Sequence, residues 1–224
     1  MQEEIKIIET PQDTSPNQPP SETTNTERKN PNKSDCDPSI FFRSTGLIRG
    51  TYLPSDKTLT EGILMTEVGL FPATANESIR NFLKKHSKKK TLKVKHHFIC
   101  WVRGIPDPPY YLLAITSRTG QKNLPEIFPV NNSFVCQGIV TERSRERVIL
   151  RVQMNARPDR SPDVISESIS HLEIRDCPGK VRTSQFWQFR STFSEGFLRC
   201  QSGELLANAK VTKKFIKDMG YESL

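Results

Sequence analysis

The chain carries one basic, aromatic, strand-like stretch twice. It occurs first as Lys93-Val94-Lys95-His96-His97-Phe98-Ile99-Cys100-Trp101-Val102-Arg103 and again as Lys180-Val181-Arg182-Thr183-Ser184-Gln185-Phe186-Trp187-Gln188-Phe189-Arg190. Upstream of each stretch a glycine lies inside a strand-like run, Gly46 before the first and Gly138 before the second. Self-similarity of this kind is typical of one architectural unit that a chain uses twice. The sequence therefore predicts two small β-domains in tandem.

Short apolar runs bounded by Gly, Pro, Asn and Ser surround both stretches and predict about five strands in the first half of the chain. A helix is expected over 77–86, before the fourth strand, because Asn76 can cap it and Ile79, Phe82 and Leu83 fall on one face. The second half has similar strand-like runs, namely 134–140, 147–154, 170–175, 180–190 and 196–207. Strands dominate both halves, so the fold class is mainly β.

Five short strands with the turn Pro178-Gly179-Lys180-Val181 resemble an OB-fold, a small Greek-key barrel. The first unit departs from that pattern, since Leu92-Lys93-Val94 lacks the glycine. The resemblance covers residues 41–207 and implies two small OB-like β-barrel units in tandem. The run 46–55, together with 62–66, also resembles uncharacterised cyanobacterial proteins, and that likeness implies no activity.

The N-terminal segment differs from the rest of the chain in its composition. Residues 1–38 hold eight acidic and four basic side chains among six prolines, and they carry few apolar ones. Such a segment cannot bury enough surface to offset its ordering entropy, so we expect a disordered acidic tail. The expected organisation is a tail over 1–38, a first unit over 39–118, a linker over 119–131, a second unit over 132–207 and a basic segment over 208–224. Within that last segment, 211–219 reads either as a short helix or as a frayed tail.

The charge is unevenly spread. The tail has a net charge of −4 (4 basic minus 8 acidic), which leaves +12 on residues 39–224 (29 basic minus 17 acidic). The first half of this part, residues 39–125, holds +9 of this charge (14 basic minus 5 acidic). An excess of this size favours a polyanion such as a nucleic acid. An acidic protein partner, or no charge-driven partner, remains open.

The candidate nucleic-acid-binding residues are basic and aromatic side chains of both units. The densest basic segment has seven lysines in the twelve residues Lys84–Lys95, and it reads either as a phosphate-binding run or as a solvated helix end. Exposed rings can stack bases, although each ring can equally belong to the core, and one of Tyr110 and Tyr111 is expected outside because neighbours on a strand face opposite ways. The candidates are Lys84, Lys85, Lys88, Lys89, Lys90, Lys93, Lys95, Trp101, Arg103, Tyr110, Tyr111, Arg143, Arg145, Lys180, Arg182, Trp187 and Arg190.

Other chemistries have little support in the sequence. The five cysteines lack close pairs, and the four histidines lack metal spacing, so neither a disulfide framework nor a zinc site nor a cofactor is expected. There is no Gly-rich phosphate loop or nucleophile elbow. Without a signal pattern or a long apolar run, a cytoplasmic protein is the simplest reading.

We therefore expect a non-catalytic protein that binds RNA or single-stranded DNA. The alternatives are an adaptor subunit of a ribonucleoprotein or other protein assembly, and a hydrolase with an unrecognised site. Exposed aromatics beside lysine would favour the first function, a large apolar patch the second, and a pocket with convergent carboxylates the third.

Overall fold

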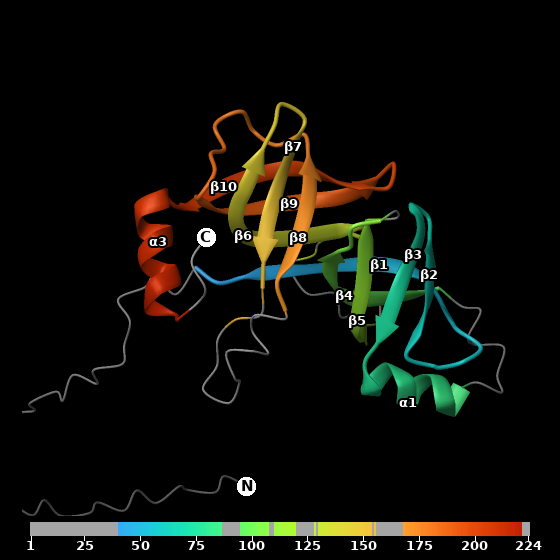
Figure 1. The fold of residues 1–224 in the computed structure, drawn as a ribbon. Coiled ribbons are helices and arrows are strands. Elements are labelled where there is room, and N and C mark those ends of the chain that lie inside the picture. The colour runs from blue at the N-terminus through green and yellow to red at the C-terminus, as the bar shows by residue number, and fades with distance from the viewer. Residues whose placement is uncertain are drawn as a thin grey trace, which may run out of the picture. The chain divides into compact units, whose positions relative to one another are not determined.

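A computed structural model describes residues 40–86, 95–107, 110–119, 128, 130–153, 155 and 168–220, and all of them belong to one compact unit, Asp35–Leu224. Strands dominate this unit (Figure 1). Its elements are β1 (Arg43–Pro54), β2 (Glu61–Thr66), β3 (Gly69–Ala75), α1 (Glu77–His86), β4 (His96–Gly104), β5 (Tyr111–Thr119), β6 (Ser133–Arg143), β7 (Arg147–Val152), β8 (Ser170–Arg175), β9 (Phe186–Ser194), β10 (Phe197–Ala207) and α3 (Ala209–Asp218).

The first five strands close into a barrel. Around the ring, β1 pairs with β2, β2 with β3, β3 with β5, β5 with β4, and β4 with β1 again. All of these pairs are antiparallel except β3 and β5, which are parallel. The helix α1 lies between β3 and β4 in the chain, and Ile79 and Leu83 turn its apolar face into the core.

The last five strands close in the same order. The ring runs β6, β7, β8, β10, β9 and back to β6, and again only the pair of third and fifth strands, β8 and β10, is parallel. No described helix separates β8 from β9, so the second barrel differs from the first at that point. The predicted mainly β fold with barrel closure is confirmed, whereas the likeness to OB-fold proteins stays a prediction.

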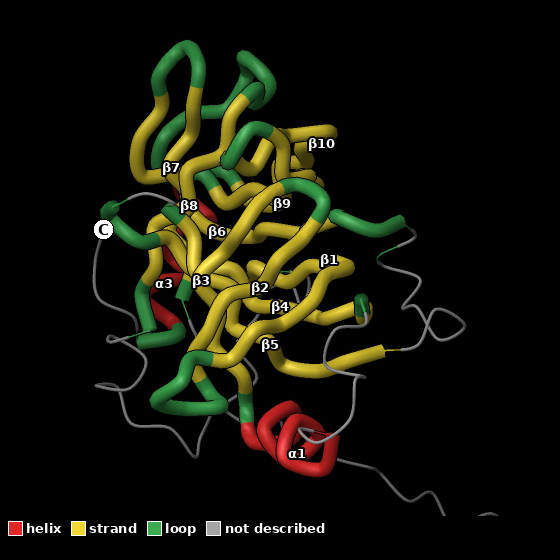
Figure 2. The backbone as a smooth tube through the Cα atoms, turned by 90° about the vertical axis from the view of Figure 1, so that its right-hand side faces the viewer, coloured by secondary structure: helices red, strands yellow, loops and turns green. Residues whose placement is uncertain are grey.

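A feature that the sequence did not predict is a hydrogen-bonded seam between the barrels. One edge of β1 pairs with β4, while the other edge pairs with β6 over its first half and with β2 over its second half. Strand β6 likewise pairs with β9 along one edge, and with β1 and then β7 along the other edge. The first strand of each barrel is long enough to pair with two other strands along one edge. The first halves of β1 and β6 pair with each other along that edge. All ten strands therefore form one continuous sheet (Figure 2).

The two barrels also share a core. The ring of Phe193 in the second barrel packs against Phe71 of the first, with ring centroids 4.6 Å apart. The hydroxyl of Tyr111, in β5, donates to the Glu173 carbonyl at 2.6 Å and accepts from the Leu198 backbone N–H at 3.3 Å. One cluster of buried side chains extends through both barrels, so their packing is continuous.

The C-terminal segment is helical, which decides between the two readings of 211–219. Asn208 caps α3 by accepting hydrogen bonds from the backbone N–H groups of Lys210 and Val211. Phe215 then packs against Phe42 and Phe186, with ring centroids 6.0 and 5.7 Å away. The helix is held by this burial rather than by its basic composition.

Candidate nucleic-acid interface

The predicted lysine run is only partly covered by the structure. Lys84 and Lys85 are exposed near the end of α1, while Lys88, Lys89, Lys90 and Lys93 lie outside the described residues. Lys95 is exposed and forms an ion pair with Glu67, with the Nζ–Oε1 distance 3.0 Å. The charge of Lys95 is therefore partly neutralised by Glu67 within the protein.

The aromatic candidates separate sharply by burial. Tyr111 is fully buried and Trp187 is 1% exposed, so neither ring is accessible to a base. Trp101 is half-buried on β4. Tyr110 is 38% exposed, which agrees with the expectation that one of the two adjacent tyrosines faces outward. We therefore remove Tyr111 and Trp187 from the proposed interface, because both are needed in the core.

Tyr110 belongs to a group of stacked side chains that the sequence analysis missed. Its ring stacks on Phe197, with centroids 5.6 Å apart and an interplanar angle of 23°. The guanidinium of Arg175 lies over the Phe197 ring, with Cζ 3.2 Å from the centroid. Phe197 is the first residue of β10 and Arg175 is the last residue of β8, both in the second barrel. Tyr110 precedes β5 of the first barrel. Their separation in the sequence concealed the group.

Two of the predicted cations converge on one backbone carbonyl, and a third is the next residue in the chain. Arg143 donates from Nη2 to the Gly179 oxygen at 3.0 Å, and Arg182 donates from Nη1 to the same oxygen at 2.8 Å. Lys180 is the next residue after Gly179, is exposed, and has its Nζ 5.9 Å from the Trp187 ring centroid. We refer to Arg143, Lys180 and Arg182 as the Gly179 cluster.

The loop that carries this cluster corrects one prediction. The stretch 180–190 was expected to be a strand, but β9 begins only at Phe186. The Gln185 side chain accepts from the Arg182 backbone N–H and from Trp187 Nε1, both at 2.9 Å, and Ser184 adopts a φ of 60°. These contacts form a turn that brings Arg182 back towards Gly179. In the first unit the strand likewise begins later than expected, at His96.

The cluster has an unbalanced charge. Among the described residues, no carboxylate forms an ion pair with Arg143, Lys180 or Arg182. Other arginines of the same barrel are paired: Arg147 and Arg175 with Glu173, each at 2.9 Å, and Arg199 with Asp176 at 2.7 Å. Two guanidiniums that share a neutral carbonyl keep a local positive charge available for an external anion.

The remaining basic candidates do not join this cluster. Arg103, Arg145 and Arg190 are exposed, and across the described part of the chain no side-chain hydrogen bond or ion pair connects them to the Gly179 cluster. Arg145 nevertheless lies two residues from Arg143, in the turn between β6 and β7.

The first barrel presents a different surface. Leu53, Ile63, Met65 and Leu70 are 44%, 46%, 43% and 61% exposed. Leu53 lies opposite Ile63 across β1 and β2, and Met65 lies opposite Leu70 across β2 and β3, so the four side chains form adjacent cross-strand pairs on one outer face. We call this surface the aliphatic face.

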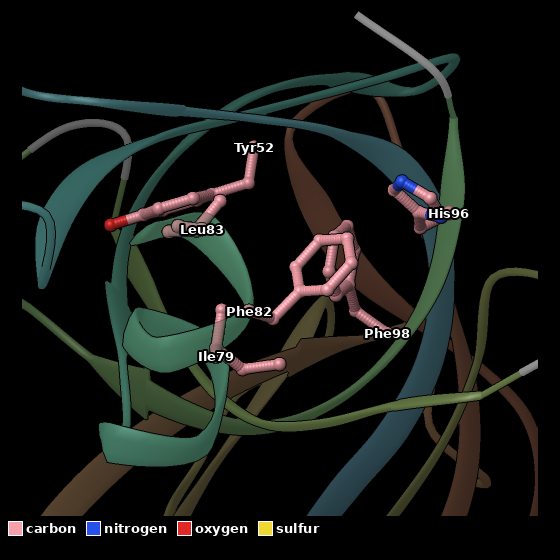
Figure 3. A pocket seen from close by; sticks show the side chains of 6 residues that line it. All are labelled: Tyr52, Ile79, Phe82, Leu83, His96 and Phe98. Atoms are coloured by element: carbon pink, nitrogen blue, oxygen red, sulfur yellow. The ribbon is translucent and has the colours of Figure 1, made fainter. Parts of the chain in front are cut away.

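A small apolar pocket lies between α1 and the strands β1 and β4 (Figure 3). Its lining residues are Tyr52, Ile79, Phe82, Leu83, His96 and Phe98. Burial and the Glu61 carboxylate raise the pKa of Tyr52 to about 12, which keeps its hydroxyl protonated at neutral pH. The lining contains no carboxylate, so this pocket does not supply the convergent acids considered for a hydrolase.

Comparison with known proteins adds no relative: no family model, curated protein or solved structure matches this chain. In the described residues, no helix is both long enough and apolar enough to cross a membrane. The same part of the chain brings together no group of three or more His, Cys, Asp or Glu side chains suited to a metal ion.

Proposed function

We propose that this protein binds single-stranded nucleic acid, RNA or DNA, and holds its phosphate backbone at the Gly179 cluster. The observation that supports this most directly is that Arg143 and Arg182 donate to one carbonyl next to Lys180, with no carboxylate partner in the described structure. A phosphate needs a positive charge and several N–H donors at one point, and guanidinium groups supply both. The net charge of +12 on residues 39–224 (29 basic minus 17 acidic) adds a long-range attraction.

The expected binding mode tolerates many sequences. Phosphate contacts position a strand but do not read its bases. Tyr110 and Phe197 offer a partly exposed ring pair that a base can extend by stacking, and every base has a π-face. A single strand can splay its bases onto such rings, whereas a duplex keeps them paired.

The decisive experiment removes the cluster and compares it with an equal charge change elsewhere. The triple variant Arg143→Gln, Lys180→Gln, Arg182→Gln should bind a fluorescent uridine or thymidine oligonucleotide about tenfold more weakly at ~0.1 M salt, with a shallower salt dependence. The matched control is Lys57→Gln, Lys213→Gln, Lys214→Gln, which changes three exposed lysines outside the cluster. Equal losses for the two triple variants would show that only net charge matters and would refute the proposed site.

A second measurement isolates stacking from electrostatics. Tyr110→Ala should lower the affinity by an amount that persists at high salt, because stacking contributes about 1–3 kcal/mol per base and is not screened. A loss that vanishes at high salt would remove the ring from the interface.

The aliphatic face favours a second candidate function, an adaptor in a ribonucleoprotein or other protein assembly. Four exposed aliphatic side chains on one barrel face suit contact with a protein surface better than contact with phosphates. A binding titration of the parent protein distinguishes the two functions. If it binds neither RNA nor single-stranded DNA in the titration above, the adaptor function replaces the nucleic-acid function.

A further inference from the structure

Two cysteines that are 23 positions apart in the sequence (200 minus 177) lie on neighbouring segments of the second barrel. Strands β8 and β10 run parallel, with Ile174 opposite Leu198 and Arg175 opposite Arg199. Continuing this register places Cys200 beside the residues that immediately follow β8, where Cys177 lies. The Cys177 thiol turns back over the end of its own strand, with Sγ 3.5 Å from the Ile174 carbonyl oxygen.

Both thiols are partly accessible. Cys177 and Cys200 are half-buried on neighbouring segments, and both pack against the same apolar core. Adjacent parallel strands have the Cα separation that a disulfide spans without large backbone movement. The other described cysteines, Cys100 and Cys136, are fully buried.

The pair is also chemically asymmetric. The neighbouring Cys177 thiol lowers the pKa of the Cys200 thiol, whereas Cys200 and burial raise the pKa of Cys177. The thiolate is the reactive form of cysteine. Cys200 is therefore the attacking thiol, and Cys177 is the resolving one.

We propose that Cys177 and Cys200 form a reversible disulfide modification site that reacts with low-molecular-weight disulfides such as glutathione disulfide. The Cys200 thiolate attacks one sulfur of the oxidant, forming a mixed disulfide and expelling one thiolate, which takes up a proton. Cys177 then loses its proton and attacks the Cys200 sulfur, so that the second glutathione leaves as a thiol. The protein dithiol is oxidised by two electrons, and one glutathione disulfide is reduced to two thiols.

The position of the bond gives it a structural consequence. Cys177 lies near the start of the loop that carries Gly179, Lys180 and Arg182, while Cys200 lies in β10. The disulfide would tie the start of that loop to the barrel wall.

The test uses the full-length chain, reduced and then incubated with glutathione disulfide under native conditions. Tryptic digestion without reductant should give one linked pair, the peptide 176–180 joined to the peptide 200–210, with the loss of two hydrogen atoms. Dithiothreitol should separate the two peptides. The variant Cys177→Ser should instead accumulate a glutathione adduct on Cys200, while Cys136→Ser should leave the linked pair unchanged.

Three results would overturn the proposal. They are a dominant link between Cys136 and Cys200, glutathione adducts on Cys36 alone, and an unmodified Cys200 in Cys177→Ser under conditions that modify Cys36. Circular dichroism of each variant before oxidation shows whether it is folded. If Cys177→Ser fails to fold, the parent digest still decides, because the linked peptides either form or do not.

Discussion

The ring of Phe134 occupies the space that a side chain at Gly46 would need. The two residues lie directly opposite each other where β1 pairs with β6, and a Cβ at Gly46 would overlap the ring carbons of Phe134. Phe134 also packs edge-to-face on Phe193, with centroids 4.8 Å apart. The absence of a side chain at position 46 therefore allows the seam between the barrels to close over an aromatic cluster.

Gly46→Ala should destabilise the protein by about 3 kcal/mol, because the new methyl group forces Phe134 out of a packed position. Urea unfolding followed by tryptophan fluorescence measures the change. The control is Gly179→Ala, where the nearest atom to a new Cβ is Arg143 Nη2 at 3.9 Å, and its effect should stay within about 0.5 kcal/mol. A Gly46→Ala variant as stable as the control would mean that the seam adapts to the added methyl group.

Tyr111→Phe should cost about 1–2 kcal/mol of stability, since it removes the hydroxyl shared by the Glu173 carbonyl and the Leu198 N–H and leaves buried polar groups unsatisfied. Its neighbour provides the matched control. Tyr110→Phe makes the same chemical change on an exposed ring, so its unfolding midpoint should not move measurably. Equal effects at the two positions would contradict the role of the Tyr111 hydroxyl in joining the barrels.

Replacement of Lys85, Lys88, Lys89 and Lys90 with Gln should weaken single-stranded nucleic-acid binding by roughly tenfold and flatten its salt dependence, because fewer counterions are released. Fluorescence anisotropy across a salt series measures both quantities. The unfolding midpoint should stay that of the parent. Unchanged binding of RNA and DNA at ~0.1 M salt would show that the lysine run is a solvated surface.

Deletion of residues 1–38 should leave the melting temperature within about 2–3 °C of the parent, because a Pro-rich, apolar-poor segment has little surface to bury. The deletion also removes a net charge of −4 (4 basic minus 8 acidic), so binding to a polyanion should strengthen slightly. Calorimetry and the binding titration check the two outcomes. A large fall in the melting temperature would show that the tail contributes to folding.

His97 should make the protein less stable as the pH falls. Burial and the positive charge of Arg49, its cross-strand partner, lower the pKa of His97. The unfolded chain therefore takes up this proton more readily, and stability is lost as the pH drops through the unfolded value of about 6.5. Arg49→Gln should raise the pKa of His97 in an NMR titration without restoring its ordinary value, because burial remains. An unchanged or lower pKa would contradict this account.

Local pattern alone was enough to identify most of the strands, the helix α1 and the repeated unit. Alternation of apolar and polar residues, turn residues and a helix cap are properties of neighbouring positions, and they do not depend on distant contacts. The same reasoning failed at 180–185, where hydrogen bonds that the Gln185 side chain accepts hold a turn in place of the expected strand. It also left open which of the two adjacent tyrosines faces outward.

The sequence by itself determined that strands dominate, that the unit occurs twice and that residues 39–224 carry a net positive charge, since these follow from composition and short-range periodicity. Only the tertiary structure decided the rest. The β1–β6 seam, the burial of Trp187, the convergence of Arg143 and Arg182 on the Gly179 carbonyl and the β8–β10 register near Cys177 and Cys200 all depend on residues that are not neighbours in the sequence. No local pattern encodes such meetings, because strand register and barrel closure set them through the packing of the whole core.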